Sequence, residues 1–306
     1  MSADVSVVIG NHQGADVLDD CLRSLAEQTC VPSEVIVVDG GSTDASRDIA
    51  ARHGARWIAE ANRGLGCLYN RGAEVAASDY VLFANNDIAL DSRCIELLRR
   101  PLANDPSLFA ADPRQLDWEG SRILHGRTTL CRGRLLHELV PGFHLDQTAD
   151  ADGVVPTVMA NGGCMLVRRS TLLELGGFDE TFFMDFEDLD VCWRAWSYGA
   201  GSVHVPDALL RHRVGGVTTR AVLPRRLASS HHNLLRWALK CLPAQDAARV
   251  LAVELLRLLR HPIVVGRGLA AFLPELREVL AERRSIQNRK CVLENLLALR
   301  RDEMQS

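Results

Sequence analysis

The sequence lacks three features that would assign it to whole classes of protein. Across its 306 residues, no stretch approaches the roughly 20 apolar residues that a membrane-spanning helix needs. The nine cysteines include no Cys-x-x-Cys pair and no regular spacing, which disfavours both a disulfide framework and a structural zinc site. No basic segment followed by an apolar leader opens the chain. We therefore expect a cytoplasmic protein that does not span the bilayer.

Charge is unevenly distributed along the chain, although the formal net charge is only −4. Residues 220–306 contain 16 Lys and Arg against 8 Asp and Glu, whereas residues 1–219 contain 19 against 31. The acidic body repels the phosphates of nucleic acid, so we expect no nucleic-acid partner. The basic tail suits the anionic inner face of a membrane or a second subunit, which would make a homodimer. Packing of the same helices on the rest of the chain is the alternative.

Short apolar runs alternate with helical spacing of apolar residues through the first third of the chain. The expected strands cover residues 5–10, 35–38, 57–58 and 80–84, and the expected helices cover residues 16–28, 43–53 and 67–77. This alternation predicts an α/β fold built on a mainly parallel, doubly wound sheet. Prolines and glycines break the pattern between residues 111 and 157, where we expect hairpins and loops. Helical patterns return at residues 171–175, at 187–198 and, in three or four segments, from residue 227 onward.

Three acidic motifs follow or interrupt apolar runs. They are Val37-Val38-Asp39-Gly40-Gly41-Ser42-Thr43-Asp44, Asn85-Asn86-Asp87 and Phe186-Glu187-Asp188-Leu189-Asp190. Ligands of open α/β sheets bind beyond the carboxyl ends of the strands, so three such ends can gather these acids into one pocket. A pocket of this kind handles a cation, a diphosphate or a proton.

The order and spacing of these motifs resemble those of the inverting GT-A glycosyltransferases of family 2, particularly the bacterial rhamnosyltransferase-like members. The resemblance covers roughly residues 5–240 and includes residues 7–13, 62–66, 70–72, 162–169 and 176–180. It implies a GT-A catalytic domain over residues 1–225, with a nucleotide-sugar half up to about 110 and an acceptor half after it. The remaining residues, 226–306, would form a helical module. The implied reaction moves a sugar from a dTDP- or UDP-sugar, such as dTDP-rhamnose, to a cell-surface glycan or lipid-linked acceptor.

The resemblance also implies which residues bind the nucleotide-sugar donor. These are Asn11, Asp39, Asn62, Gly64, Asn70, Asn86 and Asp87. Asp39 occupies the family position that accepts a hydrogen bond from the ring imide of uracil or thymine. Capping of the following turn and helix is the alternative role for this carboxylate.

Asp87 follows an apolar strand at the position of the family's Asp-x-Asp metal site, in the variant that keeps only the final acid. The resemblance implies that it coordinates Mg²⁺ or Mn²⁺, which neutralises the diphosphate leaving group. His212 resembles the late histidine that joins this metal in several relatives. The alternatives are an ordinary Asx-type turn at residues 85–87 and a structural histidine.

Asp188 matches the family's general base. An inverting transfer needs a carboxylate to take the acceptor proton while the sugar is attacked from the face opposite the leaving group. Glu187 and Asp190 are expected to orient the loop or to bind acceptor hydroxyls. The alternative is that all three acids stabilise the start of a helix through its dipole, without any role in catalysis.

Two other functions compete with this interpretation. A sugar nucleotidyltransferase needs a basic glycine-rich loop after its first strand, and residues 10–14 contain no Lys or Arg. A non-catalytic sugar-nucleotide or glycan-binding protein would be expected to lose the base or the metal acid. Both Asp188 and Asp87 are present, which favours the transferase.

Overall fold

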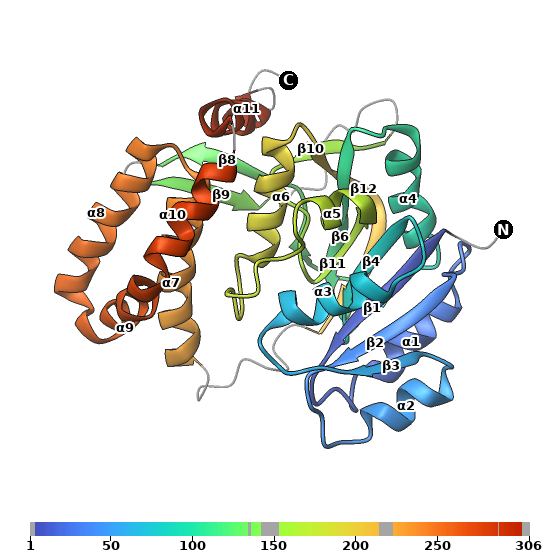
Figure 1. Cartoon of the computed structure of the whole chain (residues 1–306). Coiled ribbons are helices and arrows are strands. Elements are labelled where there is room, and N and C mark those ends of the chain that lie inside the picture. The colour runs from blue at the N-terminus through green and yellow to red at the C-terminus, as the bar shows by residue number, and fades with distance from the viewer. Residues whose placement is uncertain (1–3, 134–135, 142–152, 214–222, 287, 302–306) are drawn as a thin grey trace.

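A ten-stranded mixed sheet lies at the centre of the fold (Figure 1). The computed structural model describes residues 4–133, 136–141, 153–213, 223–286 and 288–301. The main path of the sheet runs β10 (Val155–Thr157), β12 (Gly201–His212), β6 (Leu108–Asp117), β11 (Cys164–Arg168), β4 (Tyr80–Asn85), β1 (Val5–Asn11), β2 (Glu34–Asp39) and β3 (Arg56–Ala59). Two short strands extend it, β5 (Ile88–Leu90) on β12 and β7 (Ile123–His125) on β6.

The four strands β3, β2, β1 and β4 are parallel, as the alternating sequence pattern predicts. Helices connect them on both faces: α1 (Leu18–Ala26), α2 (Ser46–Arg52) and α3 (Leu65–Val75), followed by α4 (Cys94–Asn104). Successive side chains of a strand point to opposite faces, so Val7 and Ile9 of β1 enter one hydrophobic core while Val8 enters the other. Both faces are covered, which explains why these strands read as nearly continuous apolar runs.

Beyond β4 the sheet becomes mixed, because β11 runs antiparallel to both β4 and β6. The expected irregular region between residues 111 and 157 contains the long strand β6 and a separate hairpin of β8 (Thr128–Arg132) and β9 (His137–Pro141). Two further helices follow, α5 (Arg169–Glu174) and α6 (Glu187–Ser197).

Five helices form the C-terminal part of the chain. They are α7 (Leu223–Cys241), α8 (Ala244–Arg260), α9 (Pro262–Phe272), α10 (Leu276–Ser285) and α11 (Arg289–Arg301). Pro243, Pro262 and Pro274 lie at the expected breaks, where proline suits a helix start because its missing N–H has no intrahelical partner there. In the described part of the chain, no helix is long and apolar enough to span a membrane.

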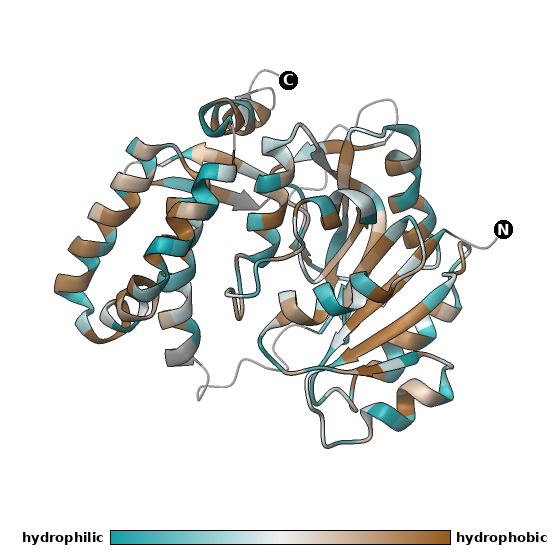
Figure 2. Ribbon diagram, viewed as in Figure 1, coloured by the Kyte–Doolittle hydropathy of each residue, from teal (hydrophilic) through white to brown (hydrophobic). Residues whose placement is uncertain are grey.

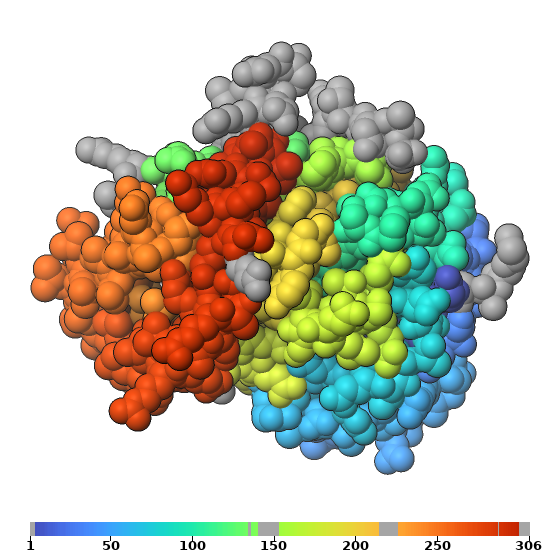
Figure 3. Space-filling model, turned by 45° about the horizontal axis from the view of Figure 1, so that its top comes forward, coloured from blue at the N-terminus to red at the C-terminus, as the bar shows by residue number. Residues whose placement is uncertain are grey.

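The C-terminal helices share a hydrophobic core with the sheet. Trp237 and Cys241 of α7 are buried in the same cluster as Trp193 of α6, and the two tryptophan rings meet edge to face at 5.1 Å. The space-filling view shows red C-terminal helices beside the yellow region of the chain (Figure 3), and α7 also contacts α6. Figure 2 shows that apolar residues colour the central strands continuously, whereas the outer helices carry mixed faces.

Candidate active site

A cleft of about 840 Å³ opens at the carboxyl ends of β1 and β4. The register of the sheet explains its position, because Asn11 pairs with Asp39 and Gly10 pairs with Asn85 at these strand ends. Most of the predicted site residues line the cleft: Asn11, Asn62, Gly64, Asn86, Asp87, Glu187, Asp188 and His212. Residues distant in sequence therefore meet at one edge of the sheet, as expected for an open α/β fold.

Asp39 supports this edge from within the protein. Its Oδ1 accepts a hydrogen bond from Asn11 Nδ2 at 2.8 Å and another from the Ser42 hydroxyl, and its Oδ2 accepts from the backbone N–H groups of Gly41 and Ser42. Asp39 is only 3% exposed and does not line the cleft. This geometry fits the turn-capping role. Contact with a base would require one of these bonds to open, so base recognition by Asp39 stays a prediction.

The amide side chains of the strand ends orient one another. Asn11 uses its Nδ2 for Asp39, so its Oδ1 is free to accept a hydrogen bond from Asn86 Nδ2 at 2.7 Å. Ser42 is used in the same network, and α2 begins only at Ser46. The helix expected over residues 43–53 therefore begins three residues later than the sequence pattern predicts.

Gly64 allows the loop after β3 to approach the opposite side of the cleft. Its φ is +117°, and a β-carbon at this position would lie 2.6 Å from the carbonyl oxygen of Phe183. Only glycine satisfies both requirements, because other residues are strained at positive φ and would collide with that backbone.

Asn70 lies outside the cleft, and the expectation that it contacts the donor is corrected here. Its Oδ1 accepts a hydrogen bond from Phe178 N at 2.8 Å, while its Nδ2 donates to Phe178 O and Glu180 Oε1 at 2.9 and 3.0 Å. All of its polar atoms thus hold the loop at residues 178–180 against α3. The sequence placed Asn70 correctly on a helix but gave no sign of this partner.

Asp87 and His212 meet in the cleft with His212 Nε2 3.2 Å from Asp87 Oδ1. This oxygen is buried and makes no hydrogen bond within the described protein. In neutral histidine only one ring nitrogen carries a proton, so the partner of Nδ1 decides what Nε2 can do. That partner is Gln115, whose Oε1 lies 3.0 Å from Nδ1.

A chain of hydrogen bonds fixes the direction of the Gln115 amide. The backbone N–H of Gly163 donates to Asn161 Oδ1 at 2.9 Å, so this oxygen is an acceptor and Gln115 Nε2 must be the donor that lies 2.9 Å from it. Gln115 Oε1 then accepts the proton of His212 Nδ1, so in the neutral form of His212 the bare Nε2 faces a carboxylate oxygen. Two acceptors facing each other suit a divalent cation.

The donor set fits Mg²⁺ or Mn²⁺ only if the ligand contributes oxygens. Among the residues that the structure describes, no group of three or more His, Cys, Asp and Glu side chains is arranged to hold a metal. Asp87 and His212 supply one carboxylate and one imidazole, and Mg²⁺ is commonly held by one or two carboxylates together with substrate phosphates and water.

Asp188 lies across the cleft at the start of α6. Its Oδ2 accepts a hydrogen bond from Gly162 N at 2.8 Å, and its Oδ1 accepts one from Leu189 N at 2.7 Å. Burial raises the pKa of Asp188, while these two backbone bonds oppose the rise by stabilising the carboxylate. The result is a carboxylate with a fixed direction and increased basicity.

Glu187 is buried beside Asp188 and differs in protonation. Burial, followed by the neighbouring Asp188 carboxylate, raises the pKa of Glu187 to about 8. Its Oε2 is buried and has no hydrogen-bond partner among the described residues. Burial therefore favours the protonated form of Glu187, whereas two N–H donors favour the carboxylate form of Asp188.

Asp190 faces away from the cleft, a position that fits the expected role of orienting the loop rather than contact with the acceptor. It is fully buried, with Oδ2 2.8 Å from Arg194 Nε and Oδ1 2.9 Å from Lys240 Nζ. Lys240 also lies 2.6 Å from Asp179. Asp190 thus belongs to a buried ionic network that joins α6 to α7. The i,i+4 spacing of Asp190 and Arg194 was visible in the sequence, but burial was not.

Three residues near the site were missed by the sequence analysis. Arg226 of α7 lines the cleft and binds Asp185 through two nitrogens at 3.0 and 3.1 Å. Gln115 and Asn161 set the orientation of His212, as described above. Asn161 directly precedes the Gly162-Gly163 motif, which was a usable signal, whereas Gln115 is an ordinary residue of an alternating strand. The Gly215-Gly216 pair beside His212 lies outside the described residues.

Comparison with known proteins gives consistent similarities. Residues 6–176 match the sequence profile of glycosyl transferase family 2. The chain is 29% identical over 255 residues to the N-acetylglucosaminyl-diphospho-decaprenol L-rhamnosyltransferase of Mycobacterium tuberculosis, covering 76% of this chain and 82% of that protein.

Two solved structures share the fold. The structure of GalNAc-T7 with UDP, GalNAc and Mn²⁺ has a TM-score of 0.61 and 17% identity, covering 78% of this chain and 48% of the other, so the chain spans about half of that protein. The mannosyltransferase PcManGT of Pyrobaculum calidifontis with GDP-Man and Mn²⁺ has a TM-score of 0.57 and 18% identity, covering 90% of this chain and 76% of the other. At this identity the similarity concerns the fold.

Proposed function

Because the chain belongs to glycosyltransferase family 2 and has the expected GT-A fold, we propose that it is a metal-dependent inverting enzyme using a dTDP- or UDP-sugar. The acceptor we propose is a hydroxyl of a lipid-linked or cell-surface glycan, and dTDP-rhamnose is the first donor to test, because the M. tuberculosis relative is a rhamnosyltransferase named for a lipid-linked acceptor. The observation that carries the proposal is the placement of Asp87 and Asp188 on one cleft.

Each side of the cleft has a separate role in this reaction. Asp87 and His212 would hold the divalent cation, which would neutralise the charge of the diphosphate leaving group. Asn11, Asn62, Gly64 and Asn86 line the side at the strand ends, where the nucleotide would bind. The catalytic domain of this proposal covers residues 1–225, and residues 226–306 form the helical module.

Asp188 acts as the general base. The acceptor hydroxyl approaches its carboxylate, attacks the anomeric carbon from the face opposite the diphosphate, and gives up its proton as the new bond forms. The fixed hydrogen bonds from Gly162 and Leu189 orient the carboxylate for this transfer. Glu187, in the protonated form that burial favours, is available to donate a hydrogen bond to an acceptor oxygen.

A donor screen tests the proposal. The enzyme is incubated with dTDP- and UDP-sugars and a polyprenyl-diphosphate glycan acceptor, with Mg²⁺, Mn²⁺ or excess chelator, and nucleoside diphosphate release is measured. We expect release that requires the metal and a product whose anomeric configuration is inverted by NMR. Full turnover in chelator, or retained configuration, would contradict the mechanism. Pyrophosphate release from a nucleoside triphosphate and a sugar phosphate would identify a nucleotidyltransferase instead.

We also propose that α8 binds an anionic membrane surface, where a lipid-linked acceptor would be found. The outer face of α8 carries exposed apolar side chains, and Ile263 of α9 extends this apolar face. The exposed fractions are 44% for Leu251, 50% for Leu255, 63% for Leu256, 81% for Leu259 and 70% for Ile263. Arg249 and Arg260 lie beside them. The two acids of α8 are turned inward, with Asp246 pairing with His137 and the buried Glu254 pairing with His231. An apolar face edged by arginine suits an interface of anionic lipid.

Vesicle sedimentation tests this surface. We expect binding to phosphatidylglycerol vesicles at low salt, weak binding to phosphatidylcholine vesicles, and loss of binding in Leu255→Ser/Leu259→Ser. The control variant is Leu173→Ser, which removes a leucine that is 42% exposed on α5. Equal binding of the double variant would contradict the proposal. A dimer that this variant abolishes would assign the face to a second subunit.

A further inference from the structure

The two residues before Glu187 adopt an unusual backbone. Asp185 has a φ of +65° and Phe186 a φ of +78°, so two consecutive residues with β-carbons lie in the left-handed region. This conformation is sterically unfavourable for residues with a β-carbon and is uncommon for a bulky residue such as phenylalanine. It persists only where the surrounding structure enforces it. The turn matters because α6, which carries Asp188, begins at the next residue.

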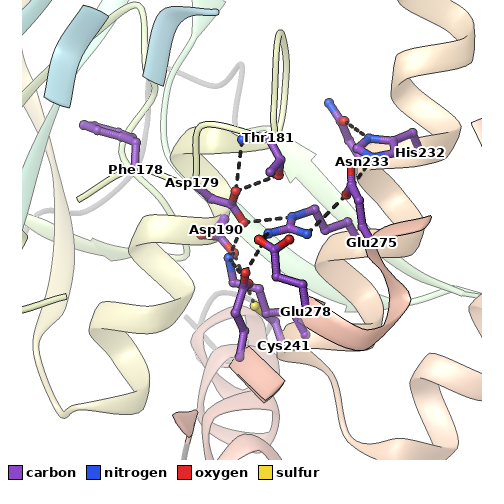
Figure 4. Close-up of polar contacts among 12 residues, drawn as sticks. Phe178, Asp179, Thr181, Asp190, His232, Asn233, Cys241, Glu275 and Glu278 are labelled. Atoms are coloured by element: carbon purple, nitrogen blue, oxygen red, sulfur yellow. Dashed lines mark hydrogen bonds and ion pairs between the residues drawn. The ribbon is translucent and has the colours of Figure 1, made fainter. Parts of the chain in front are cut away.

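Asn233 of α7 binds the backbone of this turn directly. Its Nδ2 donates to the carbonyl oxygens of Met184 and Asp185 at 2.7 and 2.8 Å, and the residue is 1% exposed. Carbonyl oxygens only accept, so the amide nitrogen must face the loop. The Oδ1 atom lies 2.8 Å from His232 Nδ1, which can donate to it. Figure 4 shows Asn233 beside His232 on this helix.

The same face of α7 contacts the loop at both of its ends. Arg226, one end of this face, binds Asp185. Trp237 packs on the Phe186 ring with a centroid distance of 6.0 Å. Lys240 reaches Asp179 at the start of the loop. Residues 226, 233, 237 and 240 recur at helical spacing, so one helix face holds the loop at its beginning and at its end.

We propose that Asn233 is a positioning residue for Asp188: by holding the carbonyl groups of Met184 and Asp185 it keeps the turn left-handed and the first turn of α6 aimed into the cleft. The inference rests on the proposed function, since Asp188 is the base. It makes α7 part of the catalytic machinery. Without Asn233 the two carbonyl groups lose their donors, and the strained turn can relax toward negative φ. Asp188 then shifts away from Gly162, whose N–H orients it.

The test compares Asn233→Ala and Asn233→Asp with the wild-type enzyme. In Asn233→Asp the size is kept, but a carboxylate oxygen faces two carbonyl oxygens and pushes the loop away. A misplacement near 1 Å lowers turnover by on the order of 10²-fold, so we expect kcat to fall about 10- to 100-fold in both variants. Affinity for the nucleoside diphosphate should change less than about twofold, because the strand ends are untouched. Asn295→Ala, at an exposed asparagine of α11, is the matched control.

Hydrogen exchange supplies a readout that does not depend on activity. The Asp190 amide donates to Phe186 O at 2.9 Å in wild type, and its exchange should accelerate in Asn233→Ala without nucleotide or acceptor present. If wild type itself transfers no sugar, the proposed function has failed, while exchange still reports on the loop. Unchanged exchange at residues 184–190 together with wild-type kcat would overturn the inference.

A second substitution separates positioning from general damage. Glycine adopts the left-handed region without strain, so the Phe186→Gly background should need Asn233 less. We expect Asn233→Ala to lower kcat less than about threefold in that background. An equal loss in both backgrounds would show that Asn233 acts in some other way and would overturn the role assigned to it.

Discussion

The two sides of the cleft are built by opposite means. The strand side consists of the residues that follow β1, β2 and β4, and neighbouring side chains such as Asn11, Asp39 and Asn86 fix one another by direct hydrogen bonds. The helix side consists of loop 178–186 with Glu187 and Asp188. Buried ion pairs hold this side in place, and it includes an unfavourable left-handed turn. The sheet therefore positions the strand side by itself, whereas the helix side depends on α7.

Replacement of Asp188 by Asn should give the largest effect and should separate the two sides most clearly. Asn keeps the size and loses the basicity. A positioned carboxylate typically contributes about 10²- to 10⁴-fold, so we expect kcat to fall by that factor. Nucleoside diphosphate affinity, measured by calorimetry with Mn²⁺, should stay near wild type because the strand side is intact. Glu187→Gln should be milder, and near-normal turnover of Asp188→Asn would refute the role of base.

The same division explains how far the sequence could predict this molecule. Strand ends followed by Asp or Asn are visible as apolar runs with a polar stop, and the parallel register brings them together, so the strand side was largely foreseeable. The contacts that hold the helix side could not be foreseen from the sequence. Asp190 and Lys240 are 50 positions apart, and helical periodicity does not reveal that two charged residues are buried against each other. For this reason the sequence indicates ligand-binding roles for Asp190 and Asn70, whereas in the structure both side chains bind other parts of the protein.

Lys240→Met should destabilise the helix side next most strongly. Lys240 is 4% exposed and lies within 3.4 Å of Asp179, Asp190 and Glu282. Although burial opposes it, the Asp190 and Asp179 carboxylates raise the pKa of Lys240 well above its usual range. Removing Lys240 leaves Arg194 as the cation beside Asp190 and Arg236 as the cation beside Asp179, and loss of one partner from a buried ionic network costs about 3–5 kcal/mol.

Urea unfolding followed by circular dichroism measures this loss. The matched control is Lys290→Met, because Lys290 is 84% exposed and 3.9 Å from Glu294. Exposed pairs contribute only about 0–1 kcal/mol, so the control should unfold like wild type. A Lys240→Met variant as stable as Lys290→Met would mean that the ionic network does not hold α7 to α6.

Glu187→Gln should change how stability depends on pH. The pKa of Glu187 is about 8 in the folded protein, and burial is the main cause. Between the ordinary pKa of glutamate and pH 8, Glu187 is protonated in the folded protein and ionised in the unfolded protein. The contribution of this group to the free energy of unfolding is therefore present at low pH and is lost as the pH rises through that range. A shift of this size corresponds to a few kcal/mol, on the order of 1.4 per pH unit. Glutamine does not titrate, so we expect the fall in unfolding free energy from pH 5 to pH 8 to be smaller in the variant. If the free energy of unfolding depended on pH in the same way in wild type and in Glu187→Gln, a protonated Glu187 would be contradicted.

Gln115→Leu should have the smallest effect, and it tests the strand side alone. Gln115 accepts the proton of His212 Nδ1 and so leaves Nε2 bare toward Asp87. Leucine is similar in size but accepts nothing, so the ring loses the bond that selects its tautomer. Partners of this kind change metal affinity by roughly 10- to 100-fold. We expect weaker Mn²⁺ binding by that factor in calorimetry with nucleoside diphosphate, a larger loss in Asp87→Ala, and unchanged hydrogen exchange in the loop before Asp188. Unaltered Mn²⁺ affinity in Gln115→Leu, alongside a clear loss in Asp87→Ala, would show that the histidine tautomer does not control binding of the cation. Changed hydrogen exchange in the loop before Asp188 would show that the two sides of the cleft are not independent.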